Sequence, residues 1–421
     1  MIQTTTLSTG VTLRCYHDTR FKQGRLSLHL LRPMCREEAA MNALIPAVLL
    51  RGTRHHPDMR AITRHLDDLY GATVADVVRR DGDYQAVGFV CGFTDDRFAL
   101  PGDQILAPVV DFLRELLLEP LTEKGGFCEK FVIREKEARI EDIESVYDDK
   151  PLYAAHRLLE IMCPEDSFGI PRLGTAEQVA AITPAMLFDQ YRTMLRTSPV
   201  EIFYVGSAQP EQAAALLRPI FDGFDRQPMT LPPQTPFRDA GHRRLRNEID
   251  TAQSILTMSF VTPITNTCRE HAAMRVLNSL FGAGMTSKLF MNVREKLSLC
   301  YSIGSEYYGS KGILTVQAGI DAKQETTVRT EILAQLEACR QGNITVPELH
   351  SAKTTLLSAL QSVHDSPGSI ENYYSAQARS GVSQSVAEYR AAVEAVTARD
   401  VAAAAATLQE HSAYFLKGVG Q

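Results

Sequence analysis

The chain has 421 residues, of which 44% are hydrophobic and 22% are charged, as in an ordinary globular protein. At about 150 residues per domain, this length suits two large domains or three ordinary ones. The net charge of −6 argues against a nucleic-acid binder, which needs a basic surface, and no apolar run approaches the roughly 20 residues that span a bilayer.

The cysteines point to a reducing compartment. All eight are widely spaced, and none forms a CxxC pair. The first 14 residues are polar and read as a strand, without a basic segment followed by an apolar core. We therefore expect reduced thiols and a cytoplasmic protein.

Strand and helix patterns are mixed in the first half of the chain. The predicted elements are strands at 12–17 and 26–31, helices at 37–50 and 59–69, strands at 73–78 and 84–93, helices at 105–118 and 128–159, and a strand at 200–205. The helical region at 128–159 is interrupted near residues 148–151, where the sequence reads DDKP. This mixture indicates an α+β domain rather than an all-helical or all-strand domain.

A single linker divides the chain. Residues 225–240 contain four prolines and no apolar periodicity, and a basic polar stretch follows to residue 246. Proline stiffens such a segment and excludes it from a core helix. We therefore predict an N-terminal domain over 1–224, a linker over 225–244 and a C-terminal domain over 245–421.

The second half repeats the order of the first. Its predicted elements are a strand at 253–260, helices at 270–280 and 286–295, strands at 301–308 and 313–319, helices at 325–341 and 347–366, and a strand at 413–417. The repeated order predicts a duplication, with two homologous domains that each have a mostly antiparallel sheet and helices on one face.

Standard catalytic motifs are absent. The sequence contains no GxSxG nucleophile elbow, no GxxxxGK[ST] phosphate loop, and no HExxH or HxxEH zinc motif. His55 and His56 are adjacent in a predicted loop, and His65 has no second histidine at helical spacing. A zinc site needs three protein ligands, so we interpret these histidines as solvated or hydrogen-bonded side chains.

Several segments nevertheless resemble one peptidase family. They are ALIPAVLLRGT at 43–53, LDDLYGA at 66–72, GT at 174–175 with IT at 182–183, and GAGMTSKLF at 282–290 followed by REKLSLCY at 294–301. In this order they resemble the inverted zinc metallopeptidases, the family of pitrilysin, insulin-degrading enzyme and mitochondrial processing peptidase. The resemblance implies two α+β domains that together form half of a clam-shell chamber.

The chain departs from that family where the metal would bind. Aligned on Gly52, the two HxxEH histidines fall at Ala43 and Ala47, and the catalytic glutamate falls at Pro46. The family's distal ligand falls near Asp142. Alanine and proline can neither hold zinc nor take a proton from water, so we expect no metal and no cofactor.

Two further positions belong to the same comparison. Glu135 lies one motif step before the distal ligand position, and Ala75 replaces the family's asparagine beside the cleft. A carboxylate without its histidines is an ordinary charge on a helix surface. The zinc half of the site is therefore lost.

The second half keeps the segment that carries an arginine and a tyrosine seven residues apart in the family. Here these are Arg294 and Tyr301. The resemblance implies that they bind substrate by polarising the scissile carbonyl or holding the peptide backbone.

Two functions fit this pattern. The first is a non-catalytic subunit that binds peptide at a sheet edge and lends these two residues to the active site of a partner. The partner that we expect is an HxxEH-containing paralogue, and the alternative assembly is a homodimer. The alternative is a peptide-binding scaffold that assists the maturation of another protein without proteolysis. A peptidase using other ligands, such as His55 and His56, is a third and weaker hypothesis.

Overall fold

The structure, a computed structural model, describes residues 2–223, 225–239 and 241–420. Its contacts divide the chain into two compact units. Unit 1 comprises the chain up to Glu144, Ile170–Pro233 and His364–Ala376, and unit 2 comprises Ser145–Gly169, Gln234–Val363 and the chain from Gln377 onward. Each unit thus includes a segment from the other half of the sequence.

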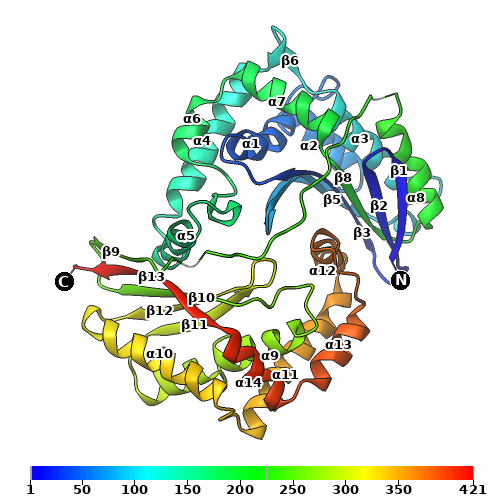
Figure 1. Cartoon of the computed structure of the whole chain (residues 1–421). Coiled ribbons are helices and arrows are strands. Elements are labelled where there is room, and N and C mark those ends of the chain that lie inside the picture. Colours follow the sequence, from blue (N-terminus) through cyan, green and yellow to red (C-terminus); the bar gives the residue numbers. More distant parts are fainter. Residues whose placement is uncertain (1, 224, 240, 421) are drawn as a thin grey trace. The chain divides into compact units, whose positions relative to one another are not determined.

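Unit 1 is built on a six-stranded sheet with the order β1-β2-β8-β3-β5-β4 (Figure 1). The strands are β1 (Ile2–Ser8), β2 (Val11–His17), β3 (Gln23–Pro33), β4 (Thr73–Asp81), β5 (Tyr84–Thr94) and β8 (Val200–Gly206). Neighbouring strands are antiparallel except β2 and β8, which are parallel. A short ribbon of β6 (Thr122–Glu123) and β7 (Gly126–Phe127) lies apart from this sheet.

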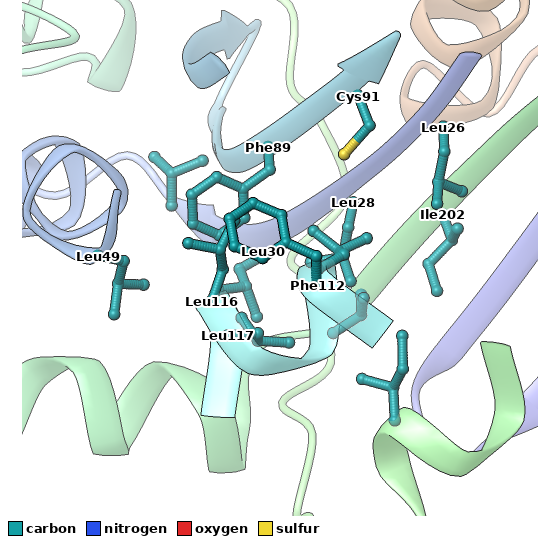
Figure 2. Packing of buried hydrophobic residues seen from close by; sticks show 14 of the residues in the cluster. Leu26, Leu28, Leu30, Leu49, Phe89, Cys91, Phe112, Leu116, Leu117 and Ile202 are labelled. Atoms are coloured by element: carbon teal, nitrogen blue, oxygen red, sulfur yellow. The ribbon is translucent and has the colours of Figure 1, made fainter. Parts of the chain in front are cut away.

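The hydrophobic core of unit 1 lies between one face of the sheet and a layer of helices. These helices are α1 (Ala39–Leu49), α2 (Met59–Asp68), α3 (Leu106–Leu118), α4 (Glu129–Ser145), α6 (Ala176–Ala181), α7 (Pro184–Thr197) and α8 (Pro210–Leu217). In Figure 2, Phe112 and Leu116 of α3 point toward Leu28 of β3 and Phe89 of β5. The alternating residues Leu26, Leu28 and Leu30 of β3 therefore face this core.

Unit 2 contains a five-stranded sheet with the order β11-β12-β10-β13-β9. The strands are β9 (Arg244–Ile249), β10 (Ser254–Val261), β11 (Ser302–Tyr308), β12 (Ile313–Ile320) and β13 (Gln409–Gly418). Its neighbours are antiparallel except β13 and β9, which are parallel. This is the order and direction of β4-β5-β3-β8-β2 in unit 1, so the predicted α+β duplication is confirmed.

The helices of unit 2 also follow the order of the first half. They are α9 (His271–Phe281), a π-helix (Leu289–Lys296), α10 (Glu325–Arg340), α11 (Val346–Gln361), α13 (Val386–Ala395) and α14 (Ala398–Thr407). Helix α9 packs against α11 and α14, and α10 packs against α14. The fully buried Phe260 of β10 and Leu277 of α9 belong to the core of this unit.

The second face of each sheet is covered by a single helix from the other half of the sequence. Helix α5 (Lys150–Met162) packs on β10 and β13 of unit 2 through Ala154 and Leu158. Helix α12 (Pro367–Arg379) covers β8 of unit 1 through Ile370, which contacts Phe203 and Val205. Both helices hold the same place in the duplicated order, so the exchange is reciprocal.

Three local features differ from the sequence prediction. The polar start of the chain forms the hairpin of β1 and β2 rather than one strand. The helix predicted at 286–295 is a π-helix at Leu289–Lys296, with Leu297 N donating to Asn292 O at 3.1 Å. Strand β9, within the polar stretch after the prolines, pairs with β13. Charged residues in β9 hid its pattern, because five of its six residues are exposed.

All eight cysteines are free, as the sequence predicted. No helix in the described ranges combines the length and the hydropathy that crossing a membrane requires.

Candidate functional site

The positions of the lost zinc motif lie on α1, which is buried along almost its whole length. Ala43 is completely buried and Ala47 is 6% exposed. Pro46 stands inside the same helix, where it lacks the backbone N–H that would bond to the preceding turn. The face that would hold a metal thus presents only methyl groups, a proline ring and backbone carbonyls.

The two acidic positions of α4 are paired with arginines. Glu135 is buried and accepts a hydrogen bond from Arg51, just beyond the end of α1. Asp142 is exposed and lies 3.5 Å from Arg139, one turn before it on α4. Both carboxylates therefore have a guanidinium as counterion.

Arg139 also reaches the other elements of this region. Its Nη2 lies 3.4 Å from the carbonyl oxygen of Ala43 and 3.4 Å from Oδ2 of Asp76 on β4. Burial and the neighbouring Arg139 lower the pKa of Arg172, which donates to Val78 O at 3.1 Å on the same strand. A cluster of arginine and aspartate thus lies where the sequence places the degenerate zinc motif.

Zinc does not fit these residues. A catalytic site supplies three nitrogen, sulfur or oxygen ligands around one point, and neither Ala43 nor Ala47 has a donor side chain. Ala75 of β4, which pairs with Val90, adds no polar group. Within the described ranges, no set of three or more His, Cys, Asp or Glu side chains is arranged to hold a metal ion.

The histidines near Gly52 are paired with glutamates of α3 and the residue that follows it. His56 Nδ1 lies 2.9 Å from Glu115, and His55 Nε2 lies 3.2 Å from Glu119. The His65 ring lies 4.4 Å from that of His56, and burial, followed by the charge of His56, lowers the pKa of His65. These contacts fix the loop after α1 and do not form a metal centre.

Arg294 and Tyr301 lie at the two ends of a tight reversal in unit 2. Arg294 is near the end of the π-helix, and Ser298 then takes a positive φ of 52° and donates to Arg294 O at 3.0 Å. Tyr301 directly precedes β11, and its N–H donates to Gly319 O at 2.8 Å. The charge of Arg294 acts on Cys300, although burial dominates and raises the pKa of that thiol to about 11.

Both side chains are accessible within unit 2. The Arg294 side chain is 42% exposed, and its guanidinium lies 4.7 Å from the centre of the Phe290 ring. Tyr301 is 68% exposed. Met285, Met291 and Leu297 of the same segment are large apolar residues that are also exposed. The segment therefore presents a guanidinium and a phenol beside apolar side chains.

Gly282 allows this segment to approach the edge of the sheet. Its carbonyl accepts a hydrogen bond from Ser305 N of β11 at 3.2 Å. A Cβ at Gly282 would lie 2.4 Å from Ser305 Oγ, so any larger residue would push the turn away from β11.

A cavity of about 300 Å³ lies beside this strand. It is lined by β11 residues including Ser302 and Gly304, by Thr257 of β10, and by Pro151 and Ala155 of α5. An open groove next to an edge strand is a suitable place for an extended peptide.

Arg139 is not among the site residues that the sequence predicts. Glu135, Arg139 and Asp142 stand at i, i+4 and i+7, which places them on one face of α4. That spacing could have shown a guanidinium between the two acids. Its contacts with Ala43 and Asp76 follow only from the packing of α1 and β4.

These observations define the class of protein: a metallopeptidase-like fold that lacks the residues for the metal. The model of the family described as "Peptidase M16 inactive domain" matches residues 181–356. Among curated proteins, the "Probable inactive metalloprotease YmfF" of Bacillus subtilis is 28% identical, with 97% of this chain and 96% of that protein covered. The "Uncharacterized zinc protease YmxG" of the same organism is 24% identical over 73% of this chain and 76% of that protein.

Solved structures agree. A conserved protein from Enterococcus faecalis V583 has a TM-score of 0.91 at 28% identity and covers 100% of this chain and 99% of its own. A peptidase M16 inactive domain from Pseudomonas fluorescens has a TM-score of 0.82 at 16% identity, with 100% and 99% covered, which shows the shared fold. Residues 181–356 thus match a model of the M16 family, and nearly the whole chain is similar to a probable inactive metalloprotease, while its own sequence contains no HxxEH zinc motif.

Proposed function

We propose that this chain is the non-catalytic subunit of a two-chain zinc peptidase, which binds peptide and supplies Arg294 and Tyr301 to the active site of its partner. The observation that carries the proposal is an asymmetry between the two sites. The metal positions hold Ala43, Pro46 and Ala47, whereas Arg294 and Tyr301 remain and are exposed. Arg294 has a long ion pair with the exposed Glu295 at 3.8 Å, so exposed donors of Arg294 and Tyr301 are available to another molecule.

The chemistry of the two side chains suits a peptide carbonyl. A guanidinium stays charged and offers a rigid fork of donors, and a phenol adds one more donor. Such groups stabilise the negative charge that develops on the carbonyl oxygen during hydrolysis. In this proposal, an HxxEH-containing homologue supplies the metal and the general base. In the scaffold alternative, no protein supplies them and the bound peptide is not cleaved.

Peptide binding would use the edge of the second sheet. Strand β11 is an edge strand, and the cavity beside it is lined by small side chains such as Ser302 and Gly304. An extended peptide gains backbone hydrogen bonds from such an edge and selectivity from neighbouring pockets. The proposed setting is the cytoplasm, which rests on the widely spaced cysteines.

Reconstitution with an HxxEH-containing M16 homologue tests the proposal. Arg294→Ala and Tyr301→Phe should each leave folding and complex formation intact and lower turnover of a fluorogenic peptide by about 10²–10³, the usual cost of one oxyanion donor. Arg390→Ala is the matched control, because Arg390 is an exposed arginine of α13 that pairs with the exposed Glu394.

The assay separates the two functions. The chain alone should cleave no peptide, and a labelled extended peptide should bind to it in a fluorescence-polarisation titration. If the double variant Arg294→Ala with Tyr301→Phe turns over as fast as the natural pair, the two residues serve no active site. Peptide binding without any stimulated turnover would favour the scaffold function.

A further inference from the structure

The arginine between the two acids of α4 has a consequence for the metal. An ion held by residues 43, 47 and 142 would be surrounded by α1, α4 and β4, and Arg139 already touches all three elements. Its contacts are the carbonyl of Ala43, Asp76 on β4 and Asp142 on its own helix. The guanidinium and a metal ion would therefore compete for the same small volume.

We propose that Arg139 replaces the metal as the cation of this site and excludes a divalent ion from it, so that restoring the missing ligands alone does not restore zinc binding. The inference rests on the placement of the lost ligands at residues 43, 46 and 47, which is also part of the proposed function. It adds that the site is closed by charge and by occupied space as well as by missing donors.

The guanidinium of Arg139 lies close to the carboxylate that would bind the metal ion. Arg139 Nη1 lies 3.5 Å from Asp142 Oδ2. A zinc ion bound to a carboxylate oxygen sits about 2.1 Å from it. On the side of Asp142 that faces Ala43, where Arg139 also contacts the Ala43 carbonyl, the ion would lie next to the guanidinium. Zn²⁺ next to a fixed positive charge in a partly buried site is strongly repelled.

Arg139 is also held in place. Its side chain is 12% exposed, so α4 and its neighbours leave it little room to turn toward solvent. The Nε atom is buried and has no hydrogen-bond partner among the described residues. A long side chain kept in a buried position with an unused donor is explained by the space that it fills and the acids that it neutralises.

The charges around Arg139 also disfavour the binding of a metal ion. Glu135, the second acid of α4, is buried and already paired with Arg51. Arg172 lies close enough to Arg139 for their charges to interact. Three guanidinium groups therefore balance the three carboxylates Asp76, Glu135 and Asp142, and no net negative charge remains to attract a metal ion.

Zinc content of the isolated chain provides the test. Three variants are compared: the triple change Ala43→His, Pro46→Glu and Ala47→His; the same triple change with Arg139→Gln; and the same triple change with Arg134→Gln as control. Arg134 is an exposed arginine of the same helix, so its replacement removes an equal charge away from the site.

After dialysis against micromolar zinc, elemental analysis should find close to one Zn²⁺ per chain only in the variant that carries Arg139→Gln. Its zinc affinity should exceed that of the triple variant and of the Arg134→Gln control by about tenfold or more. Equal zinc binding with Arg139 present, or no gain over the Arg134→Gln control, would overturn the inference.

A second variant avoids placing histidines in the packed helix α1. Arg139→Glu in the otherwise natural chain would bring a third carboxylate to Asp76 and Asp142 beside the Ala43 carbonyl, an oxygen set that suits Mn²⁺. We expect Mn²⁺ binding by electron paramagnetic resonance in Arg139→Glu, and none in Arg134→Glu or the natural chain. Equal binding by Arg139→Glu and Arg134→Glu would contradict the inference.

Neither readout uses peptide, a partner chain or turnover. A failure here therefore leaves the proposed role of Arg294 and Tyr301 untouched, and a failed reconstitution leaves the metal result intact.

Discussion

The two sheets share one topology but cover their second face by different chemistry. In unit 1, helix α12 brings the completely buried Glu371 onto this face, where it pairs with Arg25 of β3 and Arg79 of β4. In unit 2, helix α5 brings Ala154 and Leu158 onto a cluster of apolar residues from β9, β10 and β13. Both helices pack apolar side chains on their sheet, Ile370 in the case of α12, and α12 adds a buried ion pair to this packing.

This difference shows what a duplicated fold keeps and what it leaves free to change. A sheet that is apolar on one face and partly apolar on the other must cover both, so the place of the covering helix is retained. The residues that face this helix can differ, provided that the helix matches them. Arg25 and Arg79 need a carboxylate, whereas Ile255 of β10 needs a leucine.

Among these predictions, removing the buried carboxylate should have the largest effect on stability, because it weakens the contact of α12 with the sheet of unit 1. Glu371→Ala removes the buried carboxylate that pairs with Arg25 and Arg79, and we expect a loss of about 3 kcal/mol in the free energy of unfolding. The value lies at the low end for a buried pair because the arginine side chains are 27% and 25% exposed. Urea unfolding followed by circular dichroism measures this loss.

Glu394→Ala provides the control for the same charge change. Glu394 forms an exposed pair with Arg390 on α13, and its loss should cost under about 0.5 kcal/mol. Equal unfolding midpoints for Glu371→Ala and Glu394→Ala would show that the buried ion pair does not hold α12.

The apolar counterpart in unit 2 should give a slightly smaller effect. Leu158 of α5 is 1% exposed, and Leu158→Ala leaves a cavity against Tyr414 and Ile255. We expect a loss of about 2–3 kcal/mol, since this cluster is small and can partly collapse. Urea unfolding repeated at high sodium chloride sharpens the comparison. A loss that shrinks markedly in salt would mean that α5 is also held by charge.

Acid should act on unit 2 through two histidines whose pKa is lowered, the buried His411 and the half-buried His271. The larger effect is expected from His271. His271 at the start of α9 stacks on Tyr389, and its burial, with a smaller contribution from Arg275, lowers its pKa to about 4 from the ordinary 6.5. The unfolded chain therefore takes up this proton at a higher pH than the folded chain. Stability should fall as the pH drops from about 6.5 toward 4.

The size of this effect is modest. At pH 5 the loss attributable to His271 should be about 1–2 kcal/mol relative to pH 7, and His271→Phe should remove it while keeping the ring on Tyr389. The exposed His350, changed to phenylalanine, serves as control. Thermal unfolding between pH 7 and 5 measures this effect. If the unfolding temperatures of His271→Phe and the natural chain fall in parallel with pH, His271 does not cause the loss of stability in acid.

A similar contrast separates the two candidate sites. In unit 1, the positions on α1 that align with the zinc motif are buried, and Glu135 and Asp142 of α4 pair with Arg51 and Arg139. In unit 2, Arg294 and Tyr301 stay exposed beside an edge strand. On our proposal, unit 1 has lost its metal chemistry and unit 2 has kept the donors Arg294 and Tyr301.

The sequence by itself determined the duplication, the α+β class and the loss of the metal ligands. Apolar alternation along β3 and β10 marks residues that face a core, and the repeated order of elements shows that two such cores exist. Side chains without donors at 43, 46 and 47 exclude zinc coordination whatever the surrounding fold. The first two conclusions need only local pattern, whereas the place of the lost ligands rests on the resemblance to the inverted zinc metallopeptidases.

Only the tertiary structure decided which elements meet. The pattern of α5 shows that Leu158 is buried, but not that it packs on the sheet of the second half. Glu371 in sequence is one more helix acid, and its pairing with Arg25 spans 346 residues. The same holds for Arg139, whose contacts with Ala43 and Asp76 depend on how α4 lies against α1 and β4. Periodicity reports that a face is covered, whereas the identity of the covering group depends on long-range packing that no local pattern contains.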